Sequence, residues 1–193
     1  MLIPLAAIAA TLAASAPLLR SAGLHRVEQG LFDLARHYHT DRKIALFEDV
    51  SALGSSTLVT AVAVVGGIGL ALGGRLRDAA LLAAVCALSG ATGTWMKRVT
   101  RRSRPGQPTG ATFGSSFPSS HTLMATACWL TIGALAAEAA AGALQGWLLA
   151  AAFGIALAVG LARVFLHVHY LSDVLAGWVL GAAWAAAAVL ARG

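Results

Sequence analysis

Three short polar stretches interrupt an otherwise apolar chain of 193 residues. They read KRVTRRSRP at residues 97–105, FPSSHT at 117–122 and ARVFLHVHYLSD at 162–173. Between them they contain cations, hydroxyl groups, imidazoles and a carboxylate, all of which can take part in chemistry. Ionisable residues among membrane-spanning segments are expensive to keep there and are functional by default. We therefore take these stretches as the parts of the sequence that carry the function.

The cations of these stretches indicate a site for phosphate. A phosphoryl group in transfer carries negative charge on its non-bridging oxygens, and positioned positive charges and donors stabilise it. Lys97, Arg104 and Arg163 supply three cations, and an arginine can bind two oxygens at once. The sequence therefore predicts that these three residues bind a phosphate group.

The second stretch is typical of the start of a helix. Proline followed by Ser119 and Ser120 is a helix-start signal, because serine is a preferred N-cap residue. A helix N-terminus presents free N–H groups and a partial positive charge, which favour phosphate. We therefore expect Ser119 and Ser120 to bind phosphate, with His121 in the first turn. An ordinary histidine pKa of about 6.5 would allow His121 to donate or accept a proton.

The third stretch contains His169 and Asp173, four residues apart. If a helix begins near Tyr170, this separation places the two side chains on one face. His167 lies two residues before His169, and such a pair can also read as a metal site. A metal needs further ligands as well, so we do not expect a metal here.

The composition predicts a membrane protein. Hydrophobic residues make up 58% of the chain and charged residues 11%, whereas a soluble domain of this length needs far more polar surface. A helix needs about 20 apolar residues to cross roughly 30 Å of hydrocarbon. Six segments qualify, at residues 2–19, 50–73, 78–96, 121–141, 144–166 and 171–190. Alternating ten-residue segments of a membrane barrel are absent. We therefore predict an all-α, polytopic membrane bundle of six transmembrane helices in one domain, residues 1–193.

The order of the six spans places the basic residues on one side of the membrane. Because each span reverses the chain direction, residues 20–49, 97–120 and 163–173 fall on the same side. That side has all six histidines and most of the cations, whereas the other side has only Arg75, Arg77 and Arg192. A basic surface attracts anions, and at a membrane the obvious anion is a lipid head group.

The segment at residues 20–49 predicts an amphipathic helix in the interface. Leu24, Val27, Leu31, Leu34 and Tyr38 recur at helical spacing with charged residues between them. We expect this helix to border the route by which a lipid head group reaches the site. Other polar residues on this side are expected to have no part in the chemistry: His25, His37 and His39 are solvated, Glu48 and Asp49 lie at the membrane boundary, and Arg98, Arg101 and Arg102 contact lipid or solvent.

Two further features concern processing and packing. Residues 14–16 read Ala-Ser-Ala, which looks a little like a signal-peptide cleavage site, but no Lys or Arg precedes the apolar segment. We therefore expect a retained helix. Cys86 and Cys128 both fall inside predicted spans and are expected to be packing residues rather than a disulfide.

In order and spacing, the three polar stretches resemble the signatures of the type 2 phosphatidic acid phosphatase superfamily. Those signatures are Lys-x6-Arg-Pro, Pro-Ser-Gly-His and Ser-Arg-x5-His-x3-Asp, and the resemblance covers Lys97 to Asp173. Two residues depart from it, since Ser120 replaces the glycine of the second signature and Ala162 the serine of the third. Ser120 keeps a backbone N–H for phosphate but adds bulk, and neither change removes a residue with a chemical role.

The resemblance implies a metal-independent lipid phosphate phosphatase with no cofactor. His169 would be the nucleophile that forms a phosphohistidine, and Asp173 would orient its ring. His121 would be the general acid for the leaving oxygen and later the base that activates water. Lys97, Arg104, Ser119, Ser120 and Arg163 would bind the phosphate. The matched pattern assigns His169 but not His167. Residues 106–117 read as a loop that carries these groups over the site.

The substrate expected from the resemblance is a polyprenyl diphosphate or a glycerophospholipid phosphate. The chain resembles most the bacterial phosphatidylglycerophosphatase B and undecaprenyl-diphosphatase type. Alternatives are a lipid A phosphatase on the same scaffold, a non-enzymatic lipid-phosphate binder or transporter, and a vanadium haloperoxidase, although the last are soluble. The expected partners are the bilayer and a membrane lipid phosphate, not nucleic acid, and the sequence does not predict the oligomeric state.

The expected location is the bacterial inner membrane, with the site facing the periplasm. The excess of cations on the site's side would by itself place that side in the cytoplasm. Phosphate binding accounts for several of these cations, however, and the resemblance favours an outward-facing site. The turn with Arg75 and Arg77 is then expected in the cytoplasm.

Overall fold

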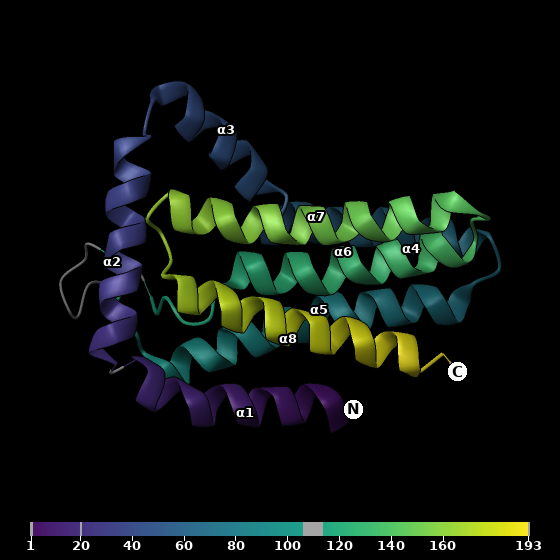
Figure 1. Cartoon of the computed structure of the whole chain (residues 1–193). Coiled ribbons are helices and arrows are strands. Elements are labelled where there is room, and N and C mark those ends of the chain that lie inside the picture. The colour runs from purple at the N-terminus through teal and green to yellow at the C-terminus, as the bar shows by residue number, and fades with distance from the viewer. Residues whose placement is uncertain (1, 20, 106–113, 193) are drawn as a thin grey trace.

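The computed structural model describes residues 2–19, 21–105 and 114–192, and their regular secondary structure is entirely helical. Eight helices follow one another along this part of the chain (Figure 1). They are α1 (Leu2–Leu19), α2 (Ala22–His37), α3 (Asp41–Ala52), α4 (Ser56–Leu72), α5 (Leu76–Thr100), α6 (Ser120–Glu138), α7 (Ala143–Phe165) and α8 (Leu171–Leu190). The prediction of an all-α fold is confirmed.

The number of membrane spans differs from the prediction. Each of the six predicted segments contains a helix, but only α5, α6, α7 and α8 are long and apolar enough to span a membrane by themselves. A fifth candidate is the pair of α3 and α4, which is bent by 44° at a short break. In α1 the apolar stretch is the shorter Leu2–Ala14. The protein is thus a multi-pass membrane protein, and the count of six spans is not confirmed.

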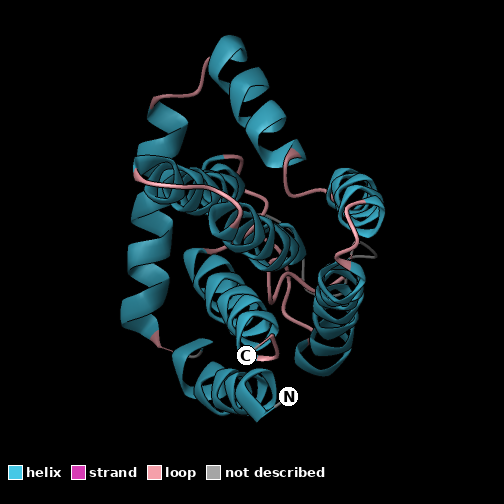
Figure 2. Cartoon of the chain, turned by 90° about the vertical axis from the view of Figure 1, so that its right-hand side faces the viewer, coloured by secondary structure: helices cyan, strands magenta, loops and turns pink. Residues whose placement is uncertain are grey.

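Helix α6 lies at the centre of the bundle and packs against α4, α5, α7 and α8 (Figure 2). Small residues allow this close packing. A Cβ atom added at Gly181 of α8 would lie 2.6 Å from the carbonyl oxygen of Leu123 in α6. One added at Gly133 of α6 would lie 2.5 Å from the Cβ atom of Ala152 in α7. The backbones of α7 and α8 therefore approach α6 so closely at these two positions that there is no room for a side chain.

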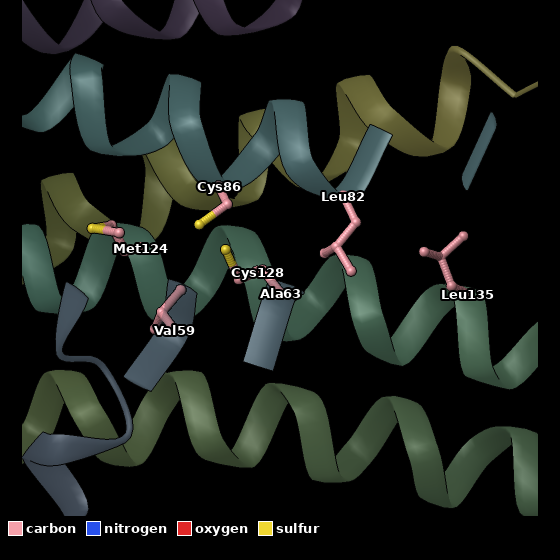
Figure 3. Close-up of a cluster of buried hydrophobic side chains, with 7 residues drawn as sticks. All are labelled: Val59, Ala63, Leu82, Cys86, Met124, Cys128 and Leu135. Atoms are coloured by element: carbon pink, nitrogen blue, oxygen red, sulfur yellow. The ribbon is translucent and has the colours of Figure 1, made fainter. Parts of the chain in front are cut away.

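A cluster of buried apolar side chains joins α4, α5 and α6 (Figure 3). Cys86 from α5 and Cys128 from α6 lie within it, and both are buried free cysteines. The prediction that they pack rather than form a disulfide is confirmed. The other members of the cluster are Val59, Ala63, Leu82, Met124 and Leu135.

The predicted interfacial helix is in fact two helices. α2 ends at His37, and a new helix, α3, begins at Asp41 with the Thr40 side chain as its N-cap. α2 runs across one end of the bundle, roughly perpendicular to helices α4 to α8 (Figure 1). Its apolar stripe is largely exposed, with Val27 and Leu34 each 56% accessible. This stripe is thus available to contact lipid, while the adjacent face, with Glu28, Phe32 and Ala35, packs on the protein.

Candidate active site

The predicted site residues lie at the end of the bundle that α2 crosses. The C-terminal ends of α5 and α7 and the N-terminal ends of α6 and α8 meet there (Figure 1). His121 interacts electrostatically with Lys97, Arg104, Arg163 and His169. The two histidines and the three cations therefore come together from separate parts of the chain.

His169 and Asp173 form a buried pair. α8 begins at Leu171 with Tyr170 as its N-cap, as expected, so the two side chains share one face. Nδ1 of His169 lies 3.3 Å from Oδ2 of Asp173, which also accepts a bond of 3.0 Å from the backbone N–H of Tyr170. Both residues are at most 1% exposed. With Nδ1 bound to the carboxylate, Nε2 is the ring nitrogen that remains for chemistry.

The surroundings of His169 favour its neutral form. Burial lowers the pKa of His169 below its ordinary value, and the cations Arg163 and Arg104 act in the same direction. The hydrogen bond and the charge of Asp173 oppose this effect but do not overcome it. At neutral pH the imidazole is therefore uncharged, which is the form that can attack an electrophile.

Among the described residues, the three predicted phosphate-binding cations have neutral hydrogen-bond partners or none. Nη1 of Arg163 donates to Oγ of Ser51 at 2.7 Å, and Nη1 of Arg104 donates to the carbonyl oxygen of Val168 at 3.2 Å. In the part of the chain that the structure describes, no carboxylate oxygen lies within 4 Å of the cationic nitrogens of Lys97, Arg104 or Arg163. Nε of Arg163 is also buried without a partner among these residues. Cations held together in this way favour an anion.

Ser119 occupies one of the two candidate N-cap positions that the sequence predicted. It is the N-cap of α6, and its side-chain oxygen accepts from the backbone N–H and the hydroxyl of Thr122. Its own backbone N–H donates to the carbonyl oxygen of Asp173 at 3.0 Å. Ser119 is fully buried, so it connects the N-termini of α6 and α8 instead of presenting these groups to a ligand.

Ser120 begins α6 and is only partly buried. A Cβ atom added at Gly93 of α5 would lie 3.2 Å from Oγ of Ser120. The extra bulk of serine at this position is therefore accommodated because the facing residue of α5 is glycine.

A pocket of about 430 Å³ opens beside His121 and Arg163. Its other wall comes from α3 and from His39, in the turn between α2 and α3. The lining residues are His39, Ile44, Glu48, Ser51, Ala52, His121, Arg163, Leu166 and Val168. The prediction for His39 is wrong, because this side chain is partly buried and bonds to the carbonyl oxygen of Phe165 at 2.9 Å. Glu48, which we expected at a membrane boundary, lines the same pocket.

The prediction for Arg102 is also wrong. We expected contact with lipid or solvent, but Nη1 of Arg102 donates to Oδ1 of Asp173 at 2.6 Å and Nη2 donates to Oε2 of Glu28 at 3.1 Å. The guanidinium also lies over the Tyr170 ring, 4.0 Å from its centroid. Sequence reasoning missed Glu28 as well. A signal was present, because Glu28 shares a helical face with Phe32 and Ala35, the other buried residues of α2.

The other three histidines, His167, His25 and His37, have no role in the site that we describe. His167 bonds to the carbonyl oxygen of Phe32 at 2.9 Å and packs edge-on against its ring. His25 and His37 are exposed. Within the described ranges, no three His, Cys, Asp or Glu residues are grouped as metal ligands.

The loop predicted at residues 106–117 is described only from Gly114 onward, and residues 106–113 lie outside the described part. In the described part, Oγ of Ser115 accepts from the backbone N–H of Arg102 at 2.9 Å. The hydroxyl of Ser116 donates to the carbonyl oxygen of Ser103 at 3.0 Å. This end of the loop therefore holds the backbone of residues 102 and 103 in place.

Two solved structures share this fold. A transmembrane PAP2 type phosphatidylglycerolphosphate phosphatase from Bacillus subtilis superposes with a TM-score of 0.87 at 22% identity, over 100% of this chain and 96% of that chain. LpxE of Aquifex aeolicus gives a TM-score of 0.66 at 20% identity, over 85% of this chain and 95% of its own. No curated protein sequence matches the chain.

The family model of the PAP2 superfamily matches residues 78–193, which is more than half of the chain. The match includes all three polar stretches and the whole of α6, α7 and α8. The chain therefore belongs to the PAP2 superfamily, as its three motifs indicated, and is a membrane enzyme of the lipid phosphatase class.

Proposed function

We propose that this enzyme hydrolyses a phosphomonoester or diphosphate on a membrane lipid, without a metal, through a phosphohistidine on His169. The observation that carries the proposal is the buried pair of His169 and Asp173 beside three cations that have no carboxylate partner in the described residues. A neutral nucleophile next to unbalanced positive charge is the arrangement that attack on a phosphate group needs.

The proposed phosphate cradle consists of Lys97, Arg104 and Arg163 with the N-terminus of α6. The first N–H groups of a helix lack partners within it, and those of Ser120 and His121 stand at this end of α6. Ser119 positions them, because its own groups bind Thr122 and Asp173. Together the cations and N–H groups neutralise the charge on the non-bridging oxygens, which is the task that a metal performs in other phosphatases.

The proposed reaction has two steps. Nε2 of His169 attacks phosphorus, so that an N–P bond forms while the P–O bond to the lipid breaks. His121 gives a proton to the departing oxygen. In the second step His121 takes a proton from water, the water oxygen forms a bond to phosphorus, and the N–P bond breaks. His169 is restored and inorganic phosphate is released. With a diphosphate substrate, the P–O bond that breaks in the first step is the one to the lipid monophosphate, which leaves as the first product.

We further propose that the substrate is a glycerophospholipid phosphate or a polyprenyl diphosphate. The fold similarity to the Bacillus subtilis phosphatidylglycerolphosphate phosphatase supports the first of these. The pocket beside Arg163 offers hydrogen-bonding groups from Ser51 and His39 for the part of the head group beyond the phosphate. A lipid A phosphatase on the same scaffold is the alternative substrate class.

Phosphate release from purified protein in detergent tests the proposal. The substrates are phosphatidylglycerophosphate, phosphatidic acid, undecaprenyl diphosphate and a lipid A phosphate. We expect release from at least one lipid, inhibition by vanadate and no effect of chelators. His169→Ala should reduce the rate by at least about 10³-fold, whereas His25→Ala, which changes an exposed histidine, should not. A variant His169→Ala that still releases phosphate, or a strict need for Mg²⁺, would contradict the mechanism.

We also propose that the site faces the outside of a bacterial inner membrane. Cysteine labelling in intact cells tests this, because both native cysteines are buried. Ser103→Cys places a thiol at an exposed position near the site, and Ala141→Cys places one at the opposite end of the bundle. An impermeant thiol reagent should label the first and not the second. The reverse pattern would show that the site faces the cytoplasm.

A further inference from the structure

Glu28 is a buried carboxylate on a helix that contains none of the three motifs. It is 1% exposed, and it lies outside residues 78–193, where the family model matches. Both of its oxygens have partners. Oε2 accepts from Nη2 of Arg102 at 3.1 Å, and Oε1 accepts from the hydroxyl and the backbone N–H of Ser172, the latter at 3.0 Å. A charge buried this completely is unfavourable unless it is paired, so its partners explain how it is tolerated.

Arg102 lies between Glu28 and Asp173 and binds both. Its Nη1 donates to Asp173 at 2.6 Å and also to the hydroxyl of Ser172 at 2.7 Å. Oδ2 of Asp173, the other oxygen, is the one that meets His169. A continuous chain of hydrogen bonds therefore runs from Glu28 on α2, through Arg102, to Asp173 and the His169 ring.

The charge balance of this chain depends on Glu28. Asp173 and Arg102 alone would form a neutral pair, and a neutral pair is a poor counter-charge for the ring of His169 when it becomes positive. With Glu28 present, two carboxylates face one guanidinium, and the group keeps one negative charge. Arg102 can then fix the position of Asp173 without cancelling its charge.

Other charged and titratable groups face the pair of His169 and Asp173 from the neighbouring elements. They are Lys97 on α5, Arg104 after α5, His121 on α6, Arg163 on α7 and Tyr170 before α8. The charged ones are cations. The carboxylates of Asp173 and Glu28 are the negative charges in the hydrogen-bonded chain that oppose these cations, and Glu48 lines the pocket beside Arg163.

We propose that Glu28 is a positioning residue of the active site, which acts through Arg102 to keep the negative charge of Asp173 available to His169. By this inference α2 is part of the catalytic machinery and not only an interfacial helix. The inference rests on the proposed role of His169 as nucleophile.

Three variants change the net charge of the group formed by Glu28, Arg102 and Asp173, and the proposal predicts the direction in which each one shifts the pH profile. Glu28→Gln leaves the group neutral, Arg102→Gln leaves two negative charges, and the double variant restores one. The acid limb of the plot of kcat/KM against pH reports the free enzyme. We expect it to move to lower pH in Glu28→Gln by about half a pH unit or more, because a negative charge that favours the protonated ring is lost. It should move to higher pH in Arg102→Gln and return close to the wild-type position in the double variant. A purely structural role would not produce shifts of opposite sign.

The rates provide a second measure. For Glu28→Gln we expect kcat to fall roughly tenfold, the size seen when a partner of an active-site ligand is lost, while KM changes little. Glu28→Asp keeps the charge and should recover part of the loss. The control is Asp33→Asn, which removes an exposed carboxylate from the same helix and should leave the profile unchanged.

Failure of this inference can be told apart from failure of the proposed function. If wild-type protein releases phosphate and His169→Ala does not, but the acid limb stays fixed in all three variants, the inference is overturned and the function stands. Folding of each variant is checked by size exclusion and thermal unfolding in detergent. If Glu28→Gln alone does not fold, the shift to higher pH in Arg102→Gln and its reversal in the double variant Arg102→Gln with Glu28→Gln decide the question. If no lipid is hydrolysed, NMR titration of the His169 ring in the same variants measures the shifts without activity, and unchanged titration overturns the inference.

Discussion

Each end of the bundle has a network of ion pairs, and the two networks differ in burial and in charge. At the site end, Glu28, Arg102 and Asp173 are 1%, 13% and 0% exposed, and two carboxylates share one guanidinium. At the opposite end, Arg75 and Arg192 bind Asp78, and Arg192 also binds Glu138. There two cations face two carboxylates, and Glu138 is 45% exposed.

The comparison shows that an ion pair in a membrane protein does not by itself indicate chemistry. The network at the opposite end is balanced and joins the ends of α5, α6 and α8, so it is suited to hold helices together. The network at the site end keeps an unbalanced charge out of water and directs it at a histidine. An unbalanced buried charge is costly, and it persists where a reacting group uses it.

The largest expected effect comes from removing the charge that meets His169. Asp173→Asn keeps the shape of the side chain but removes the acceptor that fixes the ring tautomer, so kcat should fall about 10³- to 10⁴-fold. The matched control is Asp78→Asn, the same change at the opposite end, which should leave kcat within about twofold. Phosphate release from the best lipid substrate measures both. Similar losses of kcat in the two variants would remove the distinction between the two ends.

A smaller effect is expected where Ser120 meets α5. In Gly93→Ala the new methyl group would lie 3.2 Å from Oγ of Ser120, so this serine must shift within the cradle. We expect kcat/KM to fall several-fold, about 1 kcal/mol of transition-state stabilisation, and Ser120→Gly in the same chain should restore it. Gly90→Ala on the same helix meets Met124 only at 3.7 Å and serves as the control. A loss that Ser120→Gly does not reverse would refute this steric explanation.

At the opposite end we expect a change in stability without a change in rate. Arg192→Gln removes a partner of both Asp78 and Glu138, and should lower the free energy of unfolding by about 1 kcal/mol. Thermal unfolding in detergent, with kcat measured on the same sample, distinguishes the two properties. A fall in kcat at unchanged thermal stability would show that this end influences the chemistry.

The smallest effect is a dependence of stability on pH that comes from His169. Because the pKa of His169 is lowered in the folded protein, the unfolded chain binds a proton there below about pH 6.5 while the folded protein does not. The free energy of unfolding should therefore fall as the pH is lowered through this region. Thermal unfolding at several pH values measures the slope, and His169→Gln should reduce it. An unchanged slope in that variant would assign the effect to another group.

The sequence predicted the parts of the molecule that local pattern determines. The helix start at Tyr170 placed His169 and Asp173 on one face, and the apolar segments located α5 to α8. It did not predict the contact of Glu28 with Arg102 and Ser172, because these partners lie 74 and 144 residues away and no local pattern records such a pairing. The break between α2 and α3 was missed because the apolar spacing runs as far as Tyr38, at the break itself, and Thr40 was not recognised as an N-cap.

The hydrogen bond from Ser119 to the carbonyl oxygen of Asp173 has a consequence for how the enzyme accommodates lipids of different size. It makes the first turns of α6 and α8 a single rigid frame, so the distance between the cradle and the nucleophile is set before any lipid arrives. Under the proposed function, adjustment to a bulkier head group falls to the α3 wall, which packs on α7 through Phe47 and Phe165 and is joined to α4 by a bent connection. Under the proposed function, selection among lipids and the speed of the bond-breaking step therefore depend on different helices and can change independently.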